Sequence, residues 1–87
     1  MMVKVAFLDI GDVKLVIVFL NGPAAAADYA ALEASAAQAG FEGEVAAVWP
    51  DEHGRTRFLA RPERHAFLQA VDYDQLRAQT NAALRLQ

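Results

Sequence analysis

The chain has 87 residues, of which 55% are hydrophobic and 22% charged, and its formal net charge is -3. This composition excludes a disordered chain, and the acidic charge disfavours binding to nucleic acid or to an anionic membrane. The sequence contains no cysteine, which excludes disulfides, thiol catalysis and cysteine zinc sites. It therefore predicts one domain, residues 1–87, that depends on core packing or on association for its stability.

The first twenty residues predict a β-hairpin. Gly11-Asp12 suits a two-residue type II′ turn, in which glycine takes the first central position with positive φ. In that register Asp9 lies opposite Lys14, a pair of opposite charge, and Leu8 lies opposite Leu15. We expect the ladder to continue from there toward the N-terminus.

The second strand of this hairpin does not alternate between apolar and polar residues, as a strand with one solvent-exposed face would. Residues 15–20 read LVIVFL, so both faces of the strand are apolar, and each face needs a cover. A three-layer monomer could supply both covers from its own helices. A homodimer could supply one of them from a second copy, which the short length of the chain favours. The predicted self-association residues are Val16, Val18, Leu20, Leu76 and Leu84.

An alanine-rich helix should follow the hairpin. Asn21 or Gly22 would cap it, Pro23 would be its first residue, and Gly40 would follow its end near Ala39 as a C′ glycine. The inward-facing candidates at helical spacing are Ala25, Tyr29, Leu32 and Ala36. Because alanine buries little area, we expect this helix to cover one sheet face without sealing a large core.

Residues 44–60 predict a second hairpin with its turn at 50–54. Alternation places Val48, Phe58 and Ala60 toward the core. On the opposite face it places Trp49, Arg55, Arg57 and Leu59. Trp49 should then lie near Arg55 or Arg57, where a cation-π contact could form.

The C-terminal part predicts helix. Arg61-Pro62-Glu63 starts a short helix, and Asp72 should cap a further one, with Gln75 three residues on, as in a capping box. The last helix would carry Tyr73, Leu76, Thr80, Ala83 and Leu84 on one side. The fold prediction is therefore α+β in the order ββαββα, the last helix being single or split in two, around a four-stranded mixed or antiparallel sheet.

Catalytic patterns are weak in this chain. Ser35, Thr56 and Thr80 lie on no Gly-x-Ser-x-Gly turn, and the five glycines are isolated, so no phosphate-binding loop is predicted. Two possible chemical roles have simpler structural alternatives. A metal could bind to Asp51, Glu52 and His53, with Glu63 and His65 as further ligands, but acidic residues in a turn are better explained by solvation. His53 or His65 could act as a general acid or base, but a packing or capping role is the better explanation. We predict no enzyme, no metal and no cofactor.

Arginines gather around the second hairpin, and six residues form a candidate anion or partner site: Trp49, His53, Arg55, Arg57, Arg61 and Arg64. Three interpretations stay open. The arginines could form salt bridges within or between subunits, bind a protein or small anion, or bind nucleic acid. Residues 1–52 carry two Lys against eight acidic residues, a charge of -6, whereas residues 53–87 carry six Arg against three, a charge of +3. This split can favour attraction within the chain or head-to-tail between copies, and the alternative is two solvated surfaces.

The functional hypothesis from sequence is a non-enzymatic interaction or adaptor module that forms a homodimer. The alternative is a small-molecule, anion or nucleic-acid binding protein that uses the Arg-rich hairpin. Residues 15–20 are too short to cross a membrane, and Asp9 and Asp12 interrupt any secretory signal. We therefore expect a cytoplasmic protein, and the preference for Ala and Arg over Lys suggests a GC-rich bacterial genome.

Overall fold

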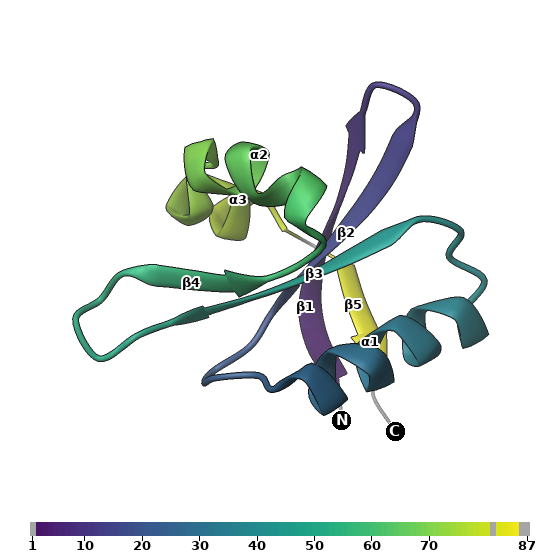
Figure 1. Cartoon of the computed structure of the whole chain (residues 1–87), viewed down its shortest axis with the longest axis horizontal. Coiled ribbons are helices and arrows are strands. Elements are labelled where there is room, and N and C mark those ends of the chain that lie inside the picture. The colour runs from purple at the N-terminus through teal and green to yellow at the C-terminus, as the bar shows by residue number, and fades with distance from the viewer. Residues whose placement is uncertain (1, 81, 86–87) are drawn as a thin grey trace.

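A five-stranded mixed sheet forms the centre of the molecule (Figure 1). The computed structural model describes the backbone of residues 2–80 and 82–85 and the side chains of residues 3–78 and 80. The strands lie in the order β4-β3-β2-β1-β5, with β2 and β3 parallel and the other pairs antiparallel. Their bounds are β1 Met2–Ile10, β2 Val13–Phe19, β3 Glu44–Pro50, β4 Thr56–Leu59 and β5 Ala82–Arg85. The predicted α+β class is confirmed, and the sheet is mixed; β5 is a fifth strand beside the four that the sequence predicts.

The first hairpin has the predicted register. Asp9 pairs with Lys14 and Leu8 with Leu15, and the ladder continues to Val5 opposite Val18. Gly11 has a φ of +59°, as the first central position of a type II′ turn requires. The turn residues therefore determine which side chains of β1 and β2 share a face.

Helix α1 (Ala26–Gln38) connects β2 to the parallel strand β3. The predicted start at Pro23 is wrong, because the N-cap is Ala25, whose N–H donates to Oδ2 of Asp28 at 2.9 Å. The end is as predicted. Gly40 has a φ of +88°, and the N–H groups of Gly40 and Phe41 donate to the carbonyls of Ala37 and Ala36, which is the Schellman pattern.

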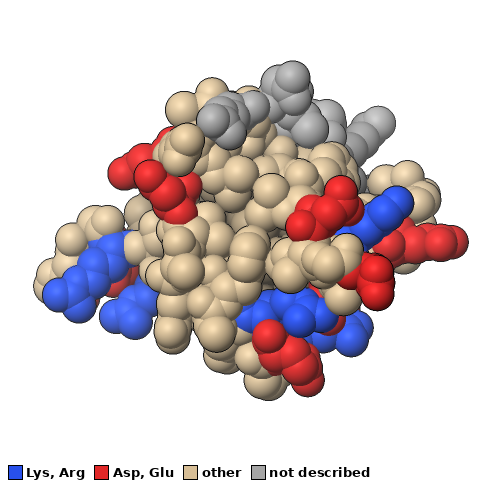
Figure 2. Space-filling model, turned by 90° about the horizontal axis from the view of Figure 1, so that it is seen from above, with Lys and Arg blue, Asp and Glu red and all other residues tan. Residues whose placement is uncertain are grey.

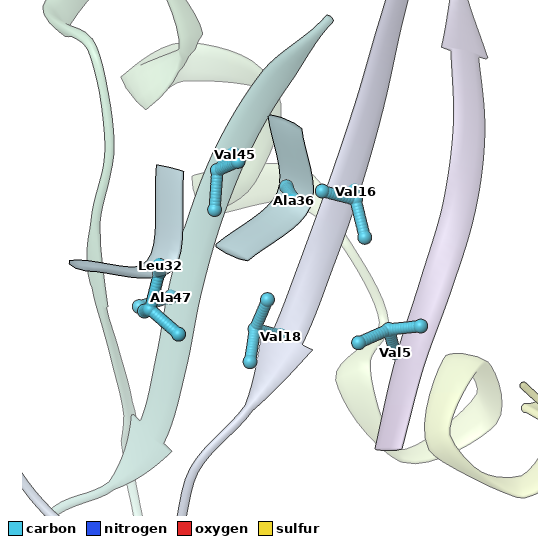
Figure 3. Packing of buried hydrophobic residues seen from close by; sticks show 7 residues of the cluster. All are labelled: Val5, Val16, Val18, Leu32, Ala36, Val45 and Ala47. Atoms are coloured by element: carbon cyan, nitrogen blue, oxygen red, sulfur yellow. The ribbon is translucent and has the colours of Figure 1, made fainter. Parts of the chain in front are cut away.

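One face of the sheet packs against α1. The inward side chains of β1, β2 and β3 meet Leu32 and Ala36 of the helix. Figure 3 shows this cluster, which consists of Val5, Val16, Val18, Leu32, Ala36, Val45 and Ala47. The hydroxyl of Tyr29 also donates to the Val45 carbonyl at 2.8 Å, so one hydrogen bond holds α1 to β3.

The opposite face packs against the C-terminal helices α2 (His65–Ala70) and α3 (Tyr73–Gln79), which follow the 3-10 turn η1 (Pro62–Arg64). The Tyr73 hydroxyl donates to the Leu68 carbonyl at 2.6 Å, and the Arg77 guanidinium lies 5.1 Å from the centroid of the Phe19 ring. The buried cluster on this face is Ala6, Leu15, Ile17, Phe19, Ala46, Val48 and Leu68.

One chain thus supplies both covers of β2, in three layers (Figure 1). Val16 and Val18 were predicted as self-association residues, but only 1% and 0% of their surface is exposed. Leu20 and Leu76 also pack against the two clusters as partly buried residues. These positions belong to the core of the monomer, because α1 covers Val16, Val18 and Leu20 and Leu76 packs on the opposite face.

The last predicted helix ends earlier than expected. Asp72 caps α3 as predicted, accepting from the Gln75 N–H at 3.1 Å, so the C-terminal unit contains two helices. Helix α3 ends at Gln79, and Ala82–Arg85 forms β5, which pairs with Met2–Val5 of β1. The prediction of Ala83 and Leu84 on a helix is wrong, because their backbone pairs with the edge of β1. The side chain of Leu84 lies outside the described residues.

Candidate interaction surfaces

The turn of the second hairpin is organised by Asp51. Its Oδ1 accepts from the backbone N–H groups of His53 and Arg55, both at 2.8 Å, and its Oδ2 accepts from Arg57 Nε at 3.1 Å. Burial acts to raise the pKa of Asp51, but the bonds from Arg55, His53 and Arg57 outweigh it and lower the pKa below the ordinary 3.8. The carboxylate is therefore a structural acceptor that fixes the turn.

Two other arginines form ion pairs with the start of β3 and with α1. Arg64 Nε donates to Glu44 Oε2. Arg61 Nε lies 3.9 Å from Glu44 Oε1, and Arg61 Nη2 lies 3.9 Å from Glu33 Oε2. The network ties the segment before α2 to the start of β3 and to α1, as expected if these arginines form salt bridges within the chain.

The six predicted site residues do not form one patch. Trp49 packs beside the α1 cluster and pairs across the sheet with Arg57, but the Arg57 guanidinium bonds to Asp51. Arg61 and Arg64 lie at the other end of the hairpin, against Glu44. Figure 2 shows acidic and basic side chains side by side on the visible face. The charge available to an anion is reduced at both ends of the hairpin.

The histidines and acidic residues do not assemble into a metal site. His53 is exposed and lies 3.5 Å from Glu52. His65 Nε2 lies 3.2 Å from the Ala60 carbonyl oxygen, and its ring packs edge-on against Phe58. Among the residues that the structure describes, no group of three or more His, Cys, Asp or Glu could hold a metal ion. His65 thus has the packing role that the sequence favoured.

The exposed aromatic residue is on the α1 side of the sheet. Phe7 is 56% exposed, and its ring centroid lies 5.6 Å from that of Phe41, which follows α1. Phe41 lines three adjacent hollows of about 190, 460 and 280 Å³. We call this region the Phe7 surface; its apolar part is Phe7, Ala39 and Phe41, which lie over the buried Val16 and Ala36, and its charged rim is Asp9, Asp12, Lys14 and Glu42.

The Phe7 surface continues onto a sheet edge. Strand β1 pairs with β2 as far as Ile10, but β5 pairs with β1 only over Met2–Val5. In the described part of the chain, residues 7–10 of β1 therefore have a strand partner on one side only. This segment belongs to the hairpin that projects from the sheet (Figure 1). Unpaired strand edges offer backbone donors and acceptors to another chain.

The sequence analysis expected both apolar faces of residues 15–20 to be covered, and Phe7 lies opposite Val16 of that strand. Helix α1 has 13 residues and is about 20 Å long, whereas β1 has nine and is about 30 Å long. The helix ends before it reaches the far part of the hairpin. The difference between these two lengths indicates that part of the hairpin stays uncovered. The sequence analysis did not compare the two lengths and so did not predict an exposed residue.

A further pocket of about 450 Å³ lies at the other end of α1, against the loop that follows β2. Its described lining comprises Val3, Phe19, Leu20, Asn21, Gly22, Pro23, Ala24, Asp28, Ala31, Leu32 and Ser35. The sequence analysis did not identify this pocket. It arises from tertiary packing of the helix on the sheet, for which the sequence has no local motif.

Comparisons with protein-family models, curated proteins and solved structures gave no significant match. The helices of the described residues include none with the length and apolar character to span a bilayer. The functional conclusion therefore depends on the surfaces described above.

Proposed function

We propose that the chain is a non-enzymatic interaction module that forms a homodimer through the Phe7 surface and the adjacent edge of β1. The observation that carries the proposal is the 56% exposure of Phe7 on a strand whose edge has no strand partner beyond Val5 in the described residues. The cysteine-free sequence is compatible with a reducing compartment, and the cytoplasm remains our prediction for its location.

The apolar centre of this surface suits a protein contact. Phe7 and Phe41 form an aromatic pair, and aromatic side chains supply much of the binding energy in protein interfaces. The hollows around Phe41 provide space into which a side chain of a partner can insert. A partner would bury Phe7 with little rearrangement of the monomer core.

A second copy is the occupant that the exposed edge of β1 favours. The rim carries Asp9, Asp12 and Glu42 together with Lys14. In a two-fold contact the same surface meets itself, so a rim with both signs can be complementary to its own copy. Antiparallel pairing of residues 7–10 across the axis would join the two sheets and satisfy the exposed edge.

Sedimentation velocity between about 5 and 500 µM tests the proposal, because this range detects dimers of micromolar affinity. We expect the wild-type weight-average mass to rise toward that of a dimer. Phe7→Ser should shift the midpoint at least tenfold to higher concentration. Leu59→Ser on β4, the opposite sheet edge, is the matched control and should leave the midpoint unchanged.

Two outcomes would contradict the proposal. The wild-type chain could remain a monomer at 500 µM, or Phe7→Ser could dimerise as the wild type does while its circular dichroism spectrum shows a native fold. Loss of association on changing Arg55 and Arg57 to Ala, with Phe7 intact, would instead assign the contact to the Arg-rich hairpin.

A further inference from the structure

The pocket beside the loop after β2 is separate from the Phe7 surface and has the size of a small-molecule site. Its volume is about 450 Å³, and ligand pockets are commonly about 300–1,000 Å³. Its described lining shares no residue with the Phe7 surface. Occupation of this pocket is therefore independent of dimerisation through Phe7.

The position of the pocket in the sheet is one at which ligands bind in many α/β proteins. Strands β2 and β3 are parallel, and the pocket lies where β2 ends and the chain turns toward α1. Ligands in open sheets commonly occupy the crevice at the carboxyl ends of parallel strands. Here the Leu20 N–H donates to the Val48 carbonyl at 2.8 Å, so the start of the loop is held against β3.

Small side chains on α1 account for the space. Ala31 stands on the pocket side of the helix, where Asp28 and Ser35 lie three and four residues away, so these residues share one helical face. The floor is apolar and includes Val3 and Leu20. A larger residue at position 31 would occupy the space between that helical face and the loop.

The polar lining selects one kind of charge. Asp28 is the charged side chain in the described lining, and Asn21 and Ser35 add neutral hydrogen-bonding groups. Oδ2 of Asp28 accepts from the Ala25 N–H, which leaves Oδ1 available to a ligand. No Lys or Arg belongs to the described lining, so within these residues an anion would meet the Asp28 carboxylate without a compensating cation.

We propose that this pocket binds a small molecule with an apolar body and a single primary or secondary ammonium group, the body lying over Val3 and Leu20 and the ammonium at Asp28. Three probes of similar size test the charge: 2-phenylethylamine, 2-phenylethanol and 3-phenylpropanoate. Titration of ¹⁵N-labelled protein with each probe reports binding at residues 20–25 and 28–35. We expect the amine to bind about two- to fivefold more tightly than the alcohol, as a partly exposed ion pair allows, and the carboxylate most weakly.

Two pairs of variants separate the pocket from the helix. Ala31→Leu fills the pocket and should abolish the shifts with the amine, whereas Ala34→Leu on the exposed side of the same helix should retain them. Asp28→Asn can still accept from the Ala25 N–H. It should therefore reduce amine affinity to that of the alcohol without changing alcohol binding.

The proposal is overturned if the three probes cause no shifts at these residues, if binding survives Ala31→Leu, or if the carboxylate binds as tightly as the amine. Failure of dimerisation would not affect this result, because the pocket and the Phe7 surface have no described residue in common.

Discussion

The two faces of the sheet are equally apolar in sequence but are covered differently. On the α2–α3 face the buried cluster contains large side chains, among them Leu15, Ile17, Phe19 and Leu68. On the α1 face, α1 contributes one leucine and one alanine to the buried cluster, and Phe7 remains exposed. The difference shows that an alanine-rich helix can shield a sheet from water and still leave pockets and an aromatic residue accessible. We infer that the α2–α3 face mainly stabilises the fold and that the α1 face mainly binds other molecules, namely a second copy and a small ligand.

The largest expected effect comes from comparing two phenylalanines of the first hairpin. Phe19 on the α2–α3 face is 8% exposed, whereas Phe7 on the α1 face is 56% exposed. We expect Phe19→Ala to reduce the free energy of unfolding by about 3–5 kcal/mol, as in other cores. Phe7→Ala should cost about 1 kcal/mol or less. Urea unfolding at low micromolar concentration, where the monomer predominates, measures both; equal losses would contradict the difference between the faces.

A glycine next to the Phe7 surface provides the next test. A Cβ at Gly43 would lie 2.4 Å from the Lys14 carbonyl oxygen and 2.8 Å from Cζ of Phe41. Gly43→Ala should therefore destabilise the protein by about 1–3 kcal/mol and move the Phe41 ring. Gly22→Ala, where a Cβ meets no atom within 4 Å, should change stability by less than about 1 kcal/mol.

These two variants can be compared by urea unfolding and by the NMR shifts of the Phe7 and Phe41 rings. A wild-type unfolding curve for Gly43→Ala would show that the loop after α1 adapts freely. The packing of Phe41 against the hairpin would then be looser than described.

The smallest expected effect is a loss of stability at alkaline pH, and it involves one tyrosine on each face of the sheet. Burial raises the pKa of Tyr73, whose hydroxyl donates to the Leu68 carbonyl, from 10.0 to about 12. Burial, then Glu33, also raises the pKa of Tyr29, and Arg61 opposes this rise. A raised phenol pKa favours the neutral form in the folded state, so its stabilisation is complete below pH 10 and is lost as the pH rises toward 12.

We therefore expect the free energy of unfolding to fall above pH 10 in the wild type and to fall less steeply in Tyr73→Phe. Tyr29→Phe should reduce the slope less, because Arg61 opposes the rise in the pKa of Tyr29. Urea unfolding between pH 8 and 11 checks this order, with absorbance at 295 nm following phenol ionisation. A steeper fall in Tyr73→Phe would contradict the role of burial.

Local signals explain which parts of the fold could be predicted. Gly11-Asp12 and the Asp9–Lys14 pair fixed the register of the first hairpin, and Gly40 marked the end of α1. The start of α1 was missed because Asp28 accepts the N-terminal N–H in place of the expected cap at Asn21 or Gly22. Each of these features depends on residues only a few positions apart.

Contacts between distant residues explain what could not be predicted. Strand β5 forms because the backbone of Leu84 pairs with Val3 at the edge of β1. The sequence of β5 has no alternating pattern that would predict a strand. The pairing of Arg64 with Glu44 spans 20 residues. The sequence therefore did not show that this arginine is occupied by an ion pair and is less available to bind an anion. The exposure of Phe7 likewise depends on where α1 ends above the sheet.

Hydrogen–deuterium exchange at two protein concentrations tests most directly whether the α1 face is the binding face. Between about 10 and 500 µM, we predict that protection increases at residues 6–10 of β1 and at residues 39–43 around Phe41. Helices α2 and α3 should exchange at unchanged rates. Concentration-dependent protection confined to residues 50–64, or to α2 and α3, would contradict the proposed roles of the two faces.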